Sequence, residues 1–217
     1  MSFNSEFYIE DGVLIKYNGT EDCVVIPDTV KIIGSRAFEN HEHMSTAVIP
    51  DSVERICEYA FYACKRLVTV EFPDRELVIE NGAFGESWDL EELIVIGEQR
   101  CLKVENGVLY SADGTELILY PAGRQSSLFA IPNGVERICN GAFYSCNQLG
   151  WVEIPDTVTH IGKSAFHSCY SLKGIAIPPS VTLVDDWAFS YCGNLNRVHI
   201  PDGEVRFGTG AFCGCAS

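Results

Sequence analysis

The sequence lacks any long uninterrupted apolar run. No stretch of about 18 apolar residues occurs in it, so we expect no helix that crosses a membrane. Residues 1–8 contain no basic segment followed by an apolar one, and they do not form a secretory signal peptide. Either the protein stays inside the cell or a signal precedes this sequence, so both locations stay open.

Positive charge is also scarce. Lysine and arginine number 15 against 30 aspartates and glutamates, which gives a formal net charge of −15. Such a surface repels phosphate backbones and anionic lipid headgroups. We therefore expect neither nucleic acid nor a membrane as a partner, whereas basic partners would be attracted.

The motifs of common catalytic and nucleotide sites are missing. The sequence has no G-x-S-x-G, P-loop or H-E-x-x-H, and no G-x-G-x-x-G between a strand and a helix. Of the five histidines, none is placed near a repeated serine or cysteine nucleophile, so no catalytic triad is indicated. The turn-rich segment 97–131 has no histidine and no paired carboxylates either. We predict a protein that is not an enzyme and holds no cofactor.

What the sequence does contain is a repeat of 23 residues. Its most regular element is an alanine-phenylalanine pair, with a proline eleven residues before each phenylalanine. The phenylalanines fall into two phased groups separated by 59 residues, which is one period plus an insertion of 36. They are Phe38, Phe61 and Phe84, then Phe143, Phe166, Phe189 and Phe212. The prolines are Pro27, Pro50, Pro73, Pro132, Pro155, Pro178 and Pro201.

The repeat unit reads L-x-x-V-x-I-P-x-x-V-x-x-I-G-x-x-A-F-x-x-C-x-x. The V-x-I portion alternates as a half-buried strand does, and proline ends it. The A-F-x-x-C-x-x-L portion has the spacing of a short helical turn, and Gly34 and Gly162 stand where the chain would pass from extended to helical. Stacked units predict an α/β solenoid with one parallel sheet on one face.

Two similar segments, 7–20 and 102–115, interrupt the repeats and predict β-hairpins. Their turns are Asp11-Gly12 and Asn106-Gly107, followed by second turns at Asn18-Gly19 and Asp113-Gly114. We therefore expect a single solenoid over residues 1–217. It divides into a hairpin cap (7–25), repeats one to three (26–96), a hairpin insertion (97–130), and repeats four to seven (131–217), the last incomplete.

Residues 154–172, IPDTVTHIGKSAFHSCYSL, resemble the BspA-like leucine-rich repeats almost position for position. The resemblance extends over residues 7–217. It implies a right-handed leucine-rich-repeat coil with no shared catalytic residues, and a bacterial surface or secreted protein linked to adhesion to host or matrix proteins. The chain departs from the general leucine-rich pattern in lacking a buried asparagine ladder. Its third coil has Glu80 and Ser87 where others have glycine and cysteine.

Five of the ten cysteines share one repeat position: Cys64, Cys146, Cys169, Cys192 and Cys215. Stacking would place them about 4.8 Å apart as a ladder of small buried hydrophobes. That separation lies within disulfide range, but parallel side chains suit the required dihedral poorly, so free thiols are expected. Cys57 and Cys139 replace the turn glycine and are interpreted as packing residues.

Two patterns could suggest a metal. His41, Glu42 and His43 are adjacent, although two histidines in a loop are weak evidence and a solvated loop is the simpler interpretation. An aspartate ladder after the prolines could bind calcium, but aspartate also favours turns by bonding to its own backbone. Its members are Asp28, Asp51, Asp74, Asp156 and Asp202. We predict no metal site.

The outward-facing strand positions are the candidate binding surface, because a rigid sheet presenting such a row is how solenoids bind partners. Trp151 stands out, since tryptophan and arginine are enriched in interface hot spots. The alternative is that Trp151 packs on neighbouring side chains of the sheet. Gly174 and Ala176 predict a hollow between Trp151 and Arg197. The predicted partner-binding residues are Glu71, Glu92, Ile94, Trp151, Glu153, Arg197 and His199.

The last repeat stops at residue 217 without its leucine and strand, so the strand ending at Ile200 would have an unpaired edge. A longer array, an edge-to-edge homodimer or shielding by the final turn could explain this. We expect a non-catalytic protein-binding or adhesion module whose partner is a host, matrix or other surface protein. An intracellular regulator and a purely structural spacer are the alternatives.

Overall fold

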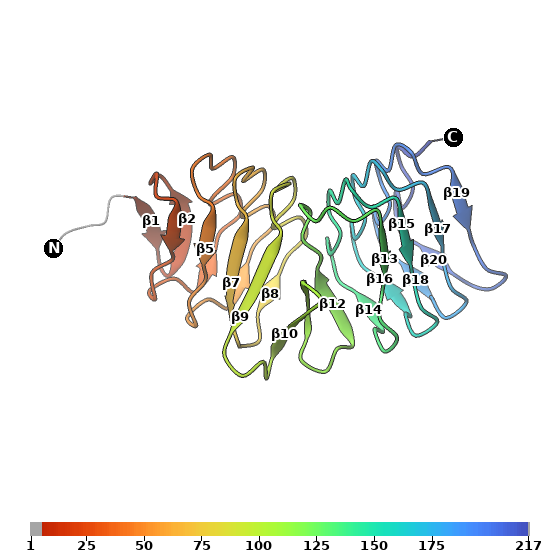
Figure 1. Ribbon diagram of the computed structural model, residues 1–217, viewed down its shortest axis with the longest axis horizontal. Coiled ribbons are helices and arrows are strands. Elements are labelled where there is room, and N and C mark those ends of the chain that lie inside the picture. Colours follow the sequence, from red (N-terminus) through yellow and green to blue (C-terminus); the bar gives the residue numbers. More distant parts are fainter. Residues whose placement is uncertain (1–5, 217) are drawn as a thin grey trace.

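The computed structural model describes residues 6–216, which form a β-solenoid with its coils stacked along one long axis (Figure 1). The strands make four sheets. Sheet B contains β3 (Cys23–Val25), β5 (Thr46–Val48), β7 (Thr69–Pro73) and β9 (Glu92–Ile96). Sheet D contains β13 (Leu128–Ala130), β15 (Trp151–Glu153), β17 (Gly174–Ala176) and β19 (Arg197–His199). These parallel strands are the V-x-I portions of the repeats.

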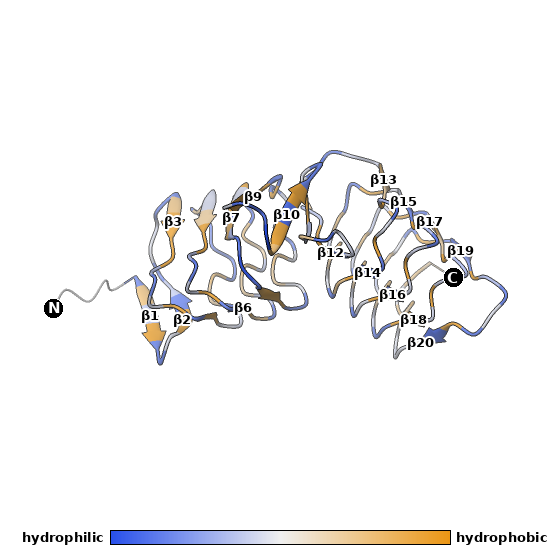
Figure 2. Ribbon diagram, turned by 90° about the horizontal axis from the view of Figure 1, so that it is seen from below, coloured by the Kyte–Doolittle hydropathy of each residue, from blue (hydrophilic) through white to orange (hydrophobic). Residues whose placement is uncertain are grey.

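The expectation of one sheet face is wrong, because the V-x-x-I portion also forms strands. Sheet A is β1 (Phe7–Glu10), β2 (Val13–Tyr17), β4 (Ile32–Ile33), β6 (Arg55–Ile56) and β8 (Val78–Ile79). Sheet C is β10 (Leu102–Glu105), β11 (Val108–Ser111), β12 (Glu116–Leu119), β14 (Arg137–Ile138), β16 (His160–Ile161), β18 (Leu183–Val184) and β20 (Arg206–Phe207). Sheets A and C lie on the side opposite sheets B and D (Figure 2).

The predicted short helical turns are also wrong, because no helix occurs within residues 6–216. Each coil carries left-handed residues nine and thirteen positions after its proline, such as Ser164 (φ 51°) and Ser168 (φ 58°). Left-handed residues four apart break the helical hydrogen-bond pattern. The backbone bonds instead run between coils, as when Phe166 N donates to Ala188 O at 2.7 Å.

The glycines at the end of the V-x-x-I portion serve a different purpose from the one expected. A Cβ on Gly34 would lie 2.7 Å from Leu14 O, and one on Gly162 would lie 2.8 Å from Asn140 N. Neither glycine has a left-handed φ. They allow a close approach between coils rather than a change into helix.

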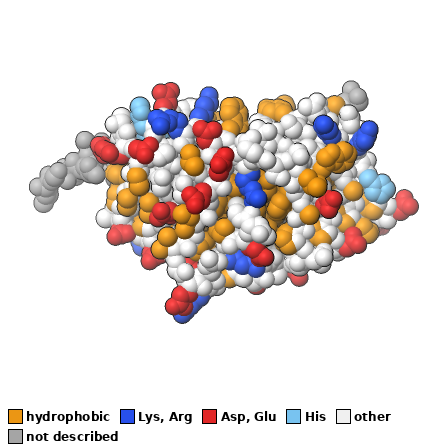
Figure 3. All heavy atoms as spheres, viewed as in Figure 1, with side chains coloured by type: hydrophobic (Ala, Val, Ile, Leu, Met, Phe, Trp, Pro, Cys, Tyr) orange, Lys and Arg blue, Asp and Glu red, His pale blue; other side chains and the backbone are white. Residues whose placement is uncertain are grey.

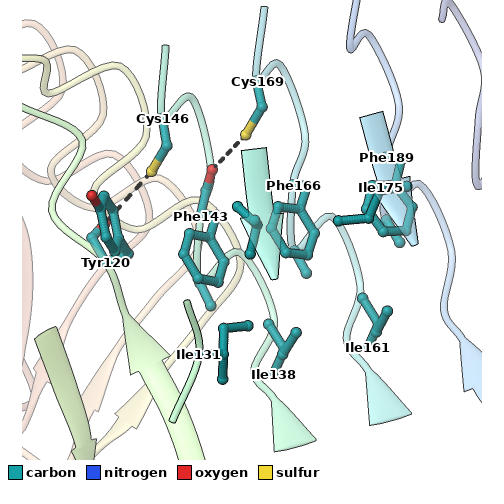
Figure 4. Close-up of a cluster of buried hydrophobic side chains, with 14 of the residues drawn as sticks. Tyr120, Ile131, Ile138, Phe143, Cys146, Ile161, Phe166, Cys169, Ile175 and Phe189 are labelled. Atoms are coloured by element: carbon teal, nitrogen blue, oxygen red, sulfur yellow. Dashed lines mark hydrogen bonds between the residues drawn. The ribbon is translucent and has the colours of Figure 1, made fainter. Parts of the chain in front are cut away.

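The phenylalanines stack in two interior ladders, as the repeat predicts, and Figure 4 shows the ladder of the second half. Phe143 and Phe166 have ring centroids 4.7 Å apart and are inclined by 6°, and Phe38 and Phe61 are 4.6 Å apart. Tyr120 begins the second ladder, 5.2 Å from Phe143. Each ladder lies in its own cluster of buried residues. Like side chains therefore touch like along each half of the solenoid.

The cysteine ladder does more than fill space. The Cys64 thiol donates to Phe38 O at 3.0 Å, and Cys169 donates to Phe143 O at the same distance. In the third coil the Ser87 hydroxyl replaces the thiol and donates to Phe61 O at 2.8 Å. All ten cysteines are free thiols, the five of the ladder included. This position therefore supplies a buried donor to the carbonyl of a phenylalanine in the preceding coil.

The segment between the two sets of repeats holds more than a hairpin. β1 pairs with β2 and β10 with β11 in antiparallel fashion. β12 then runs antiparallel to β11 and parallel to β14. Because Tyr120 continues the ring ladder and β13 continues sheet D, residues 116–130 form an additional coil.

The two halves pack against each other along the turn edge. A Cβ on Gly141 would lie 2.7 Å from Gly82 N, so the two backbones meet there. Lys163 Nζ lies 3.5 Å from Glu58 Oε1 across the same junction. Tyr144 covers it, and burial raises the pKa of its hydroxyl. Glycine on both sides permits this close contact.

Candidate functional site

The predicted residues lie on the outer faces of two different sheets. Glu71, Glu92 and Ile94 belong to sheet B. Trp151 and Glu153 lie on β15 of sheet D, and Arg197 and His199 lie on β19 of the same sheet. The structure therefore does not gather the seven residues into one site. The sequence could not show this, because the insertion interrupts the row between β9 and β13.

Sheet B offers a mixed surface. Thr69 Oγ1 donates to Glu92 Oε2 at 3.1 Å, which engages one of the two carboxylates. Glu71 is half-buried between Val48 and Ile94, its register partners on neighbouring strands. The outer face of sheet D, by contrast, carries a hollow lined by Leu128, Trp151 and Ala176 among others. We therefore place the main candidate surface on sheet D.

Trp151 is the centre of sheet D. Its register partners are Leu128 on β13 and Gly174 on β17. A Cβ on Gly174 would come within 2.5 Å of Trp151 Cζ3, so the indole lies directly over this glycine. Trp151 nevertheless stays 42% exposed. The ring therefore packs on the sheet and also presents part of its surface to solvent, and its role in binding stays a prediction.

A hollow of about 360 Å³ lies beside this indole. Its lining includes Leu128, Trp151, Glu153, Ile154 and Ala176. Trp151, Gly174 and Ala176 line this hollow, as expected, but Arg197 does not, and the hollow extends toward Leu128 and Ile154 instead. In Figure 3 hydrophobic side chains gather over β13, β15 and β17, with cationic and histidine side chains over β19. The surface is thus an apolar centre with a charged border.

Two exposed strand residues are not among the predicted ones: Leu128, which is 52% exposed, and Val25, which is 62% exposed. Val25 precedes Pro27 by two residues and Leu128 precedes Pro132 by four. The outward positions were counted forward from each proline, so the first strand of each half was left out. Counting backward from the proline would have found both residues.

One member of each pattern that could suggest a metal, His41 and Asp74, makes hydrogen bonds to the backbone. His41 Nε2 lies 3.0 Å from Gly19 O, and its Nδ1 accepts from Met44 N at 3.0 Å. Burial lowers the pKa of His41. The Asp74 carboxylate accepts backbone N–H groups of Arg100 and Cys101, which lower its pKa. No cluster of three or more metal-binding side chains occurs in the described part of the chain.

The last coil has an open surface. β19 and β20 are edge strands of sheets D and C. A hollow of about 460 Å³ lies there, lined by Leu195, Val198, Ile200, Phe212 and Cys215 among others. The equivalent positions one coil earlier are buried: Leu172, Ile175, Ile177, Phe189 and Cys192. No helix of residues 6–216 could cross a bilayer.

Comparison with known proteins agrees with this architecture. The model of the BspA type leucine-rich repeat region matches residues 16–121 and 122–217, with six copies. A search of curated proteins finds no match. The pneumococcal vaccine antigen PcpA is similar in structure, with a TM-score of 0.52, 19% identity and coverage of 96% of this chain and 76% of that one.

Two further solved structures are similar. A leucine-rich repeat protein from Bacteroides ovatus has a TM-score of 0.52 and 21% identity, over 99% of this chain and 54% of that one. A leucine-rich cell surface protein from Faecalibacterium prausnitzii has a TM-score of 0.49 and 21% identity, over 96% and 94%. At these identities the two structures with TM-scores of 0.52 show the fold alone, and the family model supplies the assignment. The chain belongs to the BspA-type leucine-rich repeat family.

Proposed function

We propose that the chain is a non-catalytic protein-binding or adhesion module that presents the outer face of sheet D to a protein partner. The observation that carries this proposal is the apolar hollow beside the half-exposed Trp151. Interfaces typically combine such an apolar centre with a polar border. An aliphatic or aromatic side chain of the partner would enter the hollow between Leu128, Trp151 and Ala176.

Charged and polar residues at the border of the hollow would orient the partner. Glu153 lies beside the hollow, and Arg197 and His199 follow two strands away on β19. All three side chains are exposed. Exposed charges at the edge of an interface influence the association rate and the choice of partner more than the affinity. The rigid sheet keeps these groups fixed before binding, which reduces the entropy lost on association.

We infer that the partner is a host, matrix or other surface protein and that the chain works at the cell surface or in secreted form. Membership of the BspA-type family supports this location. A cytoplasmic regulator and a spacer remain the competing functions. A cytoplasmic regulator would bind an intracellular partner, whereas a spacer would have no binding surface.

The open end of the last coil supports a second contact, an edge-to-edge homodimer. β19 has a free edge, and Val198 and Ile200 are exposed beside it. Sedimentation over a range of concentrations would detect the dimer, and Ile200→Lys should abolish it. A monomer at all concentrations would refute this contact.

The test of the main proposal compares two exposed tryptophans. Trp187 is 37% exposed and covers Gly210 just as Trp151 covers Gly174, but it lies on the turn edge. The wild-type chain, Trp151→Ala and Trp187→Ala would be assayed against immobilised matrix and surface proteins. Loss of a hot-spot tryptophan should weaken binding about thirtyfold or more for Trp151→Ala alone.

Thermal unfolding of the same variants serves as the control. Both tryptophans lie on the surface, so both variants should keep a melting temperature close to that of the wild type. Equal binding by all three proteins would refute sheet D as the binding surface. Absence of any binding together with normal folding would favour the spacer.

A further inference from the structure

The two halves of the solenoid are separated by a wedge-shaped groove on the side of sheets A and C. Near the turn edge the halves close to a space of only about 10 Å³. Beside β8 the same junction opens to a groove of about 680 Å³. That volume falls within the range of ligand-binding sites. The groove belongs to a different face of the molecule from sheet D.

Two unpaired sheet edges border this groove. Sheet A ends at β8, and sheet C begins at β10 (Figure 1). Residues of both strands, including Val78 and Leu102, line the space between them. An exposed strand edge with room beside it is a template for pairing with another strand.

The backbone of β8 is satisfied on one side only. Val78 N donates to Glu54 O at 3.1 Å, and Glu80 N donates to Ile56 O at 2.9 Å. The backbone N–H and C=O groups of Leu77 and Ile79 therefore face away from β6, since successive residues of a strand direct their backbone hydrogen bonds to opposite sides. Within residues 6–216, no backbone donor reaches the carbonyl of either residue.

The coil of β4, two coils before that of β8, shows what these carbonyls normally bind. Lys31 O, the equivalent of Leu77 O, accepts from Glu54 N at 2.8 Å. Ile33 O, the equivalent of Ile79 O, accepts from Cys57 N at 2.9 Å. After β8 the next coil does not follow in register, so these two carbonyls lack such a partner. Leu77 lines the wide groove, and Ile79 lies at its narrow end.

The side chains around the groove suit a basic and partly apolar segment. Val78 is 48% exposed, and Leu77 and Ile118 lie on the lining beside it. The cation of Arg55 is already paired with Glu80 at 2.6 Å. The lining carboxylates of Glu76 and Glu116 are exposed, and neither has an ion-pair partner within the described chain.

We propose that this groove binds an extended basic peptide segment of another protein, which adds to sheet A as a strand beside β8. The N–H groups of the segment donate to the carbonyls of Leu77 and Ile79, as in other cases of β-strand addition. Its apolar side chains rest on Val78 and Ile118. Its lysines or arginines face Glu76 and Glu116.

The experiment uses the full chain and a synthetic octapeptide of alternating lysine and valine as the probe. An N-methylated version of the same peptide, which cannot donate the required hydrogen bonds, is the comparator. The double variant Glu76→Lys with Glu116→Lys reverses the groove charge. Glu136→Lys, exposed on the neighbouring coil, is the matched control because it makes a single charge reversal outside the groove lining.

We expect the probe to bind the wild type and Glu136→Lys, and to bind the double variant roughly tenfold or more weakly. The N-methylated peptide should not bind. Amide hydrogen exchange at Leu77 and Ile79 should slow when the probe is present, because these groups become part of a paired strand.

Several results would overturn the proposal. These are no binding of the probe up to about 1 mM, equal binding of the N-methylated peptide, or slowed exchange on sheet D in place of β8. Concentration-dependent dimerisation that disappears in the double variant would assign the groove to a second copy of the chain instead. A failure of the Trp151 test leaves these measurements unaffected, since the two surfaces share no residue.

Discussion

Replacing Cys64 tests whether the repeated cysteine acts as a buried hydrogen-bond donor. Cys64 is fully buried, and its thiol donates to Phe38 O at 3.0 Å. Burial raises the pKa of this thiol to about 12, so it remains protonated and able to donate at neutral pH. Cys64→Ala removes the donor and leaves the carbonyl buried without this partner.

The magnitude follows from the cost of an unsatisfied buried acceptor. That cost is about 1–3 kcal/mol, to which a small cavity adds. Cys64→Ser keeps a donor, and the next coil already shows that serine works here, since Ser87 donates to Phe61 O at 2.8 Å. We therefore expect the serine variant to retain roughly half or more of the stability that the alanine variant loses.

The assay is equilibrium urea denaturation under reducing conditions, followed by tryptophan and tyrosine fluorescence. Cys213→Ala is the control, because this thiol is exposed and should be replaceable without effect. If Cys64→Ala proves as stable as the wild type, or if the serine and alanine variants are equally unstable, the donor role of this position is refuted.

Three further predictions concern other parts of the chain. Ser164→Gly should stabilise the fold by up to about 1 kcal/mol, because Ser164 has a left-handed φ of 51°. Gly141→Ala at the equivalent position should destabilise the fold, because Gly141 has a φ of 64° and a Cβ there would lie 2.7 Å from Gly82 N. Thermal unfolding measures both effects. Gly174→Ala should displace the Trp151 indole and raise its solvent exposure, which a red shift of tryptophan emission would report and an unchanged spectrum would contradict. Hydrogen bonds from Ser111 and Thr115 lower the pKa of Asp113 to about 2. The stability that Asp113 gives to the turn between β11 and β12 is therefore fully present above the ordinary pKa of 3.8 and is lost as the pH falls toward 2. Carboxyl chemical shifts measured against pH would show an ordinary pKa if these hydrogen bonds were absent.

The solenoid fold and the repeat family could both be predicted from the sequence. The proline and alanine-phenylalanine positions predicted a solenoid with stacked phenylalanines, and Phe143 and Phe166 stack at 4.7 Å. The same pattern led to the wrong prediction of short helical turns. Apolar residues spaced three to four apart occur both in a helical turn and in two successive tight turns. Ser164 and Ser168 carry positive φ in those turns, and serine gives little indication of this. Gly82 and Gly141 stand at the positions equivalent to Ser164 in other coils. These glycines were the signal in the sequence for a left-handed residue at this position.

The candidate surface shows the same division. The alternation of the strand fixed that Trp151, Glu153, Arg197 and His199 face outward, since residues two apart share one face of a sheet. Only the tertiary structure decided that the indole covers Gly174, that the hollow lies toward Leu128, and that sheets B and D are separate. These features depend on how the additional coil at 116–130 joins the halves, and that coil lacks the repeat motif.

The repeat spacing was enough to predict the periodic part of this protein, because every 23-residue unit must bury the same side chains against its neighbour to be stable. The tertiary structure alone decided the places where the period breaks. At the junction, Gly82 and Gly141 let the halves touch on one side while β8 and β10 diverge on the other. Such a wedge results from the packing of residues far apart in the chain, and no local spacing encodes it.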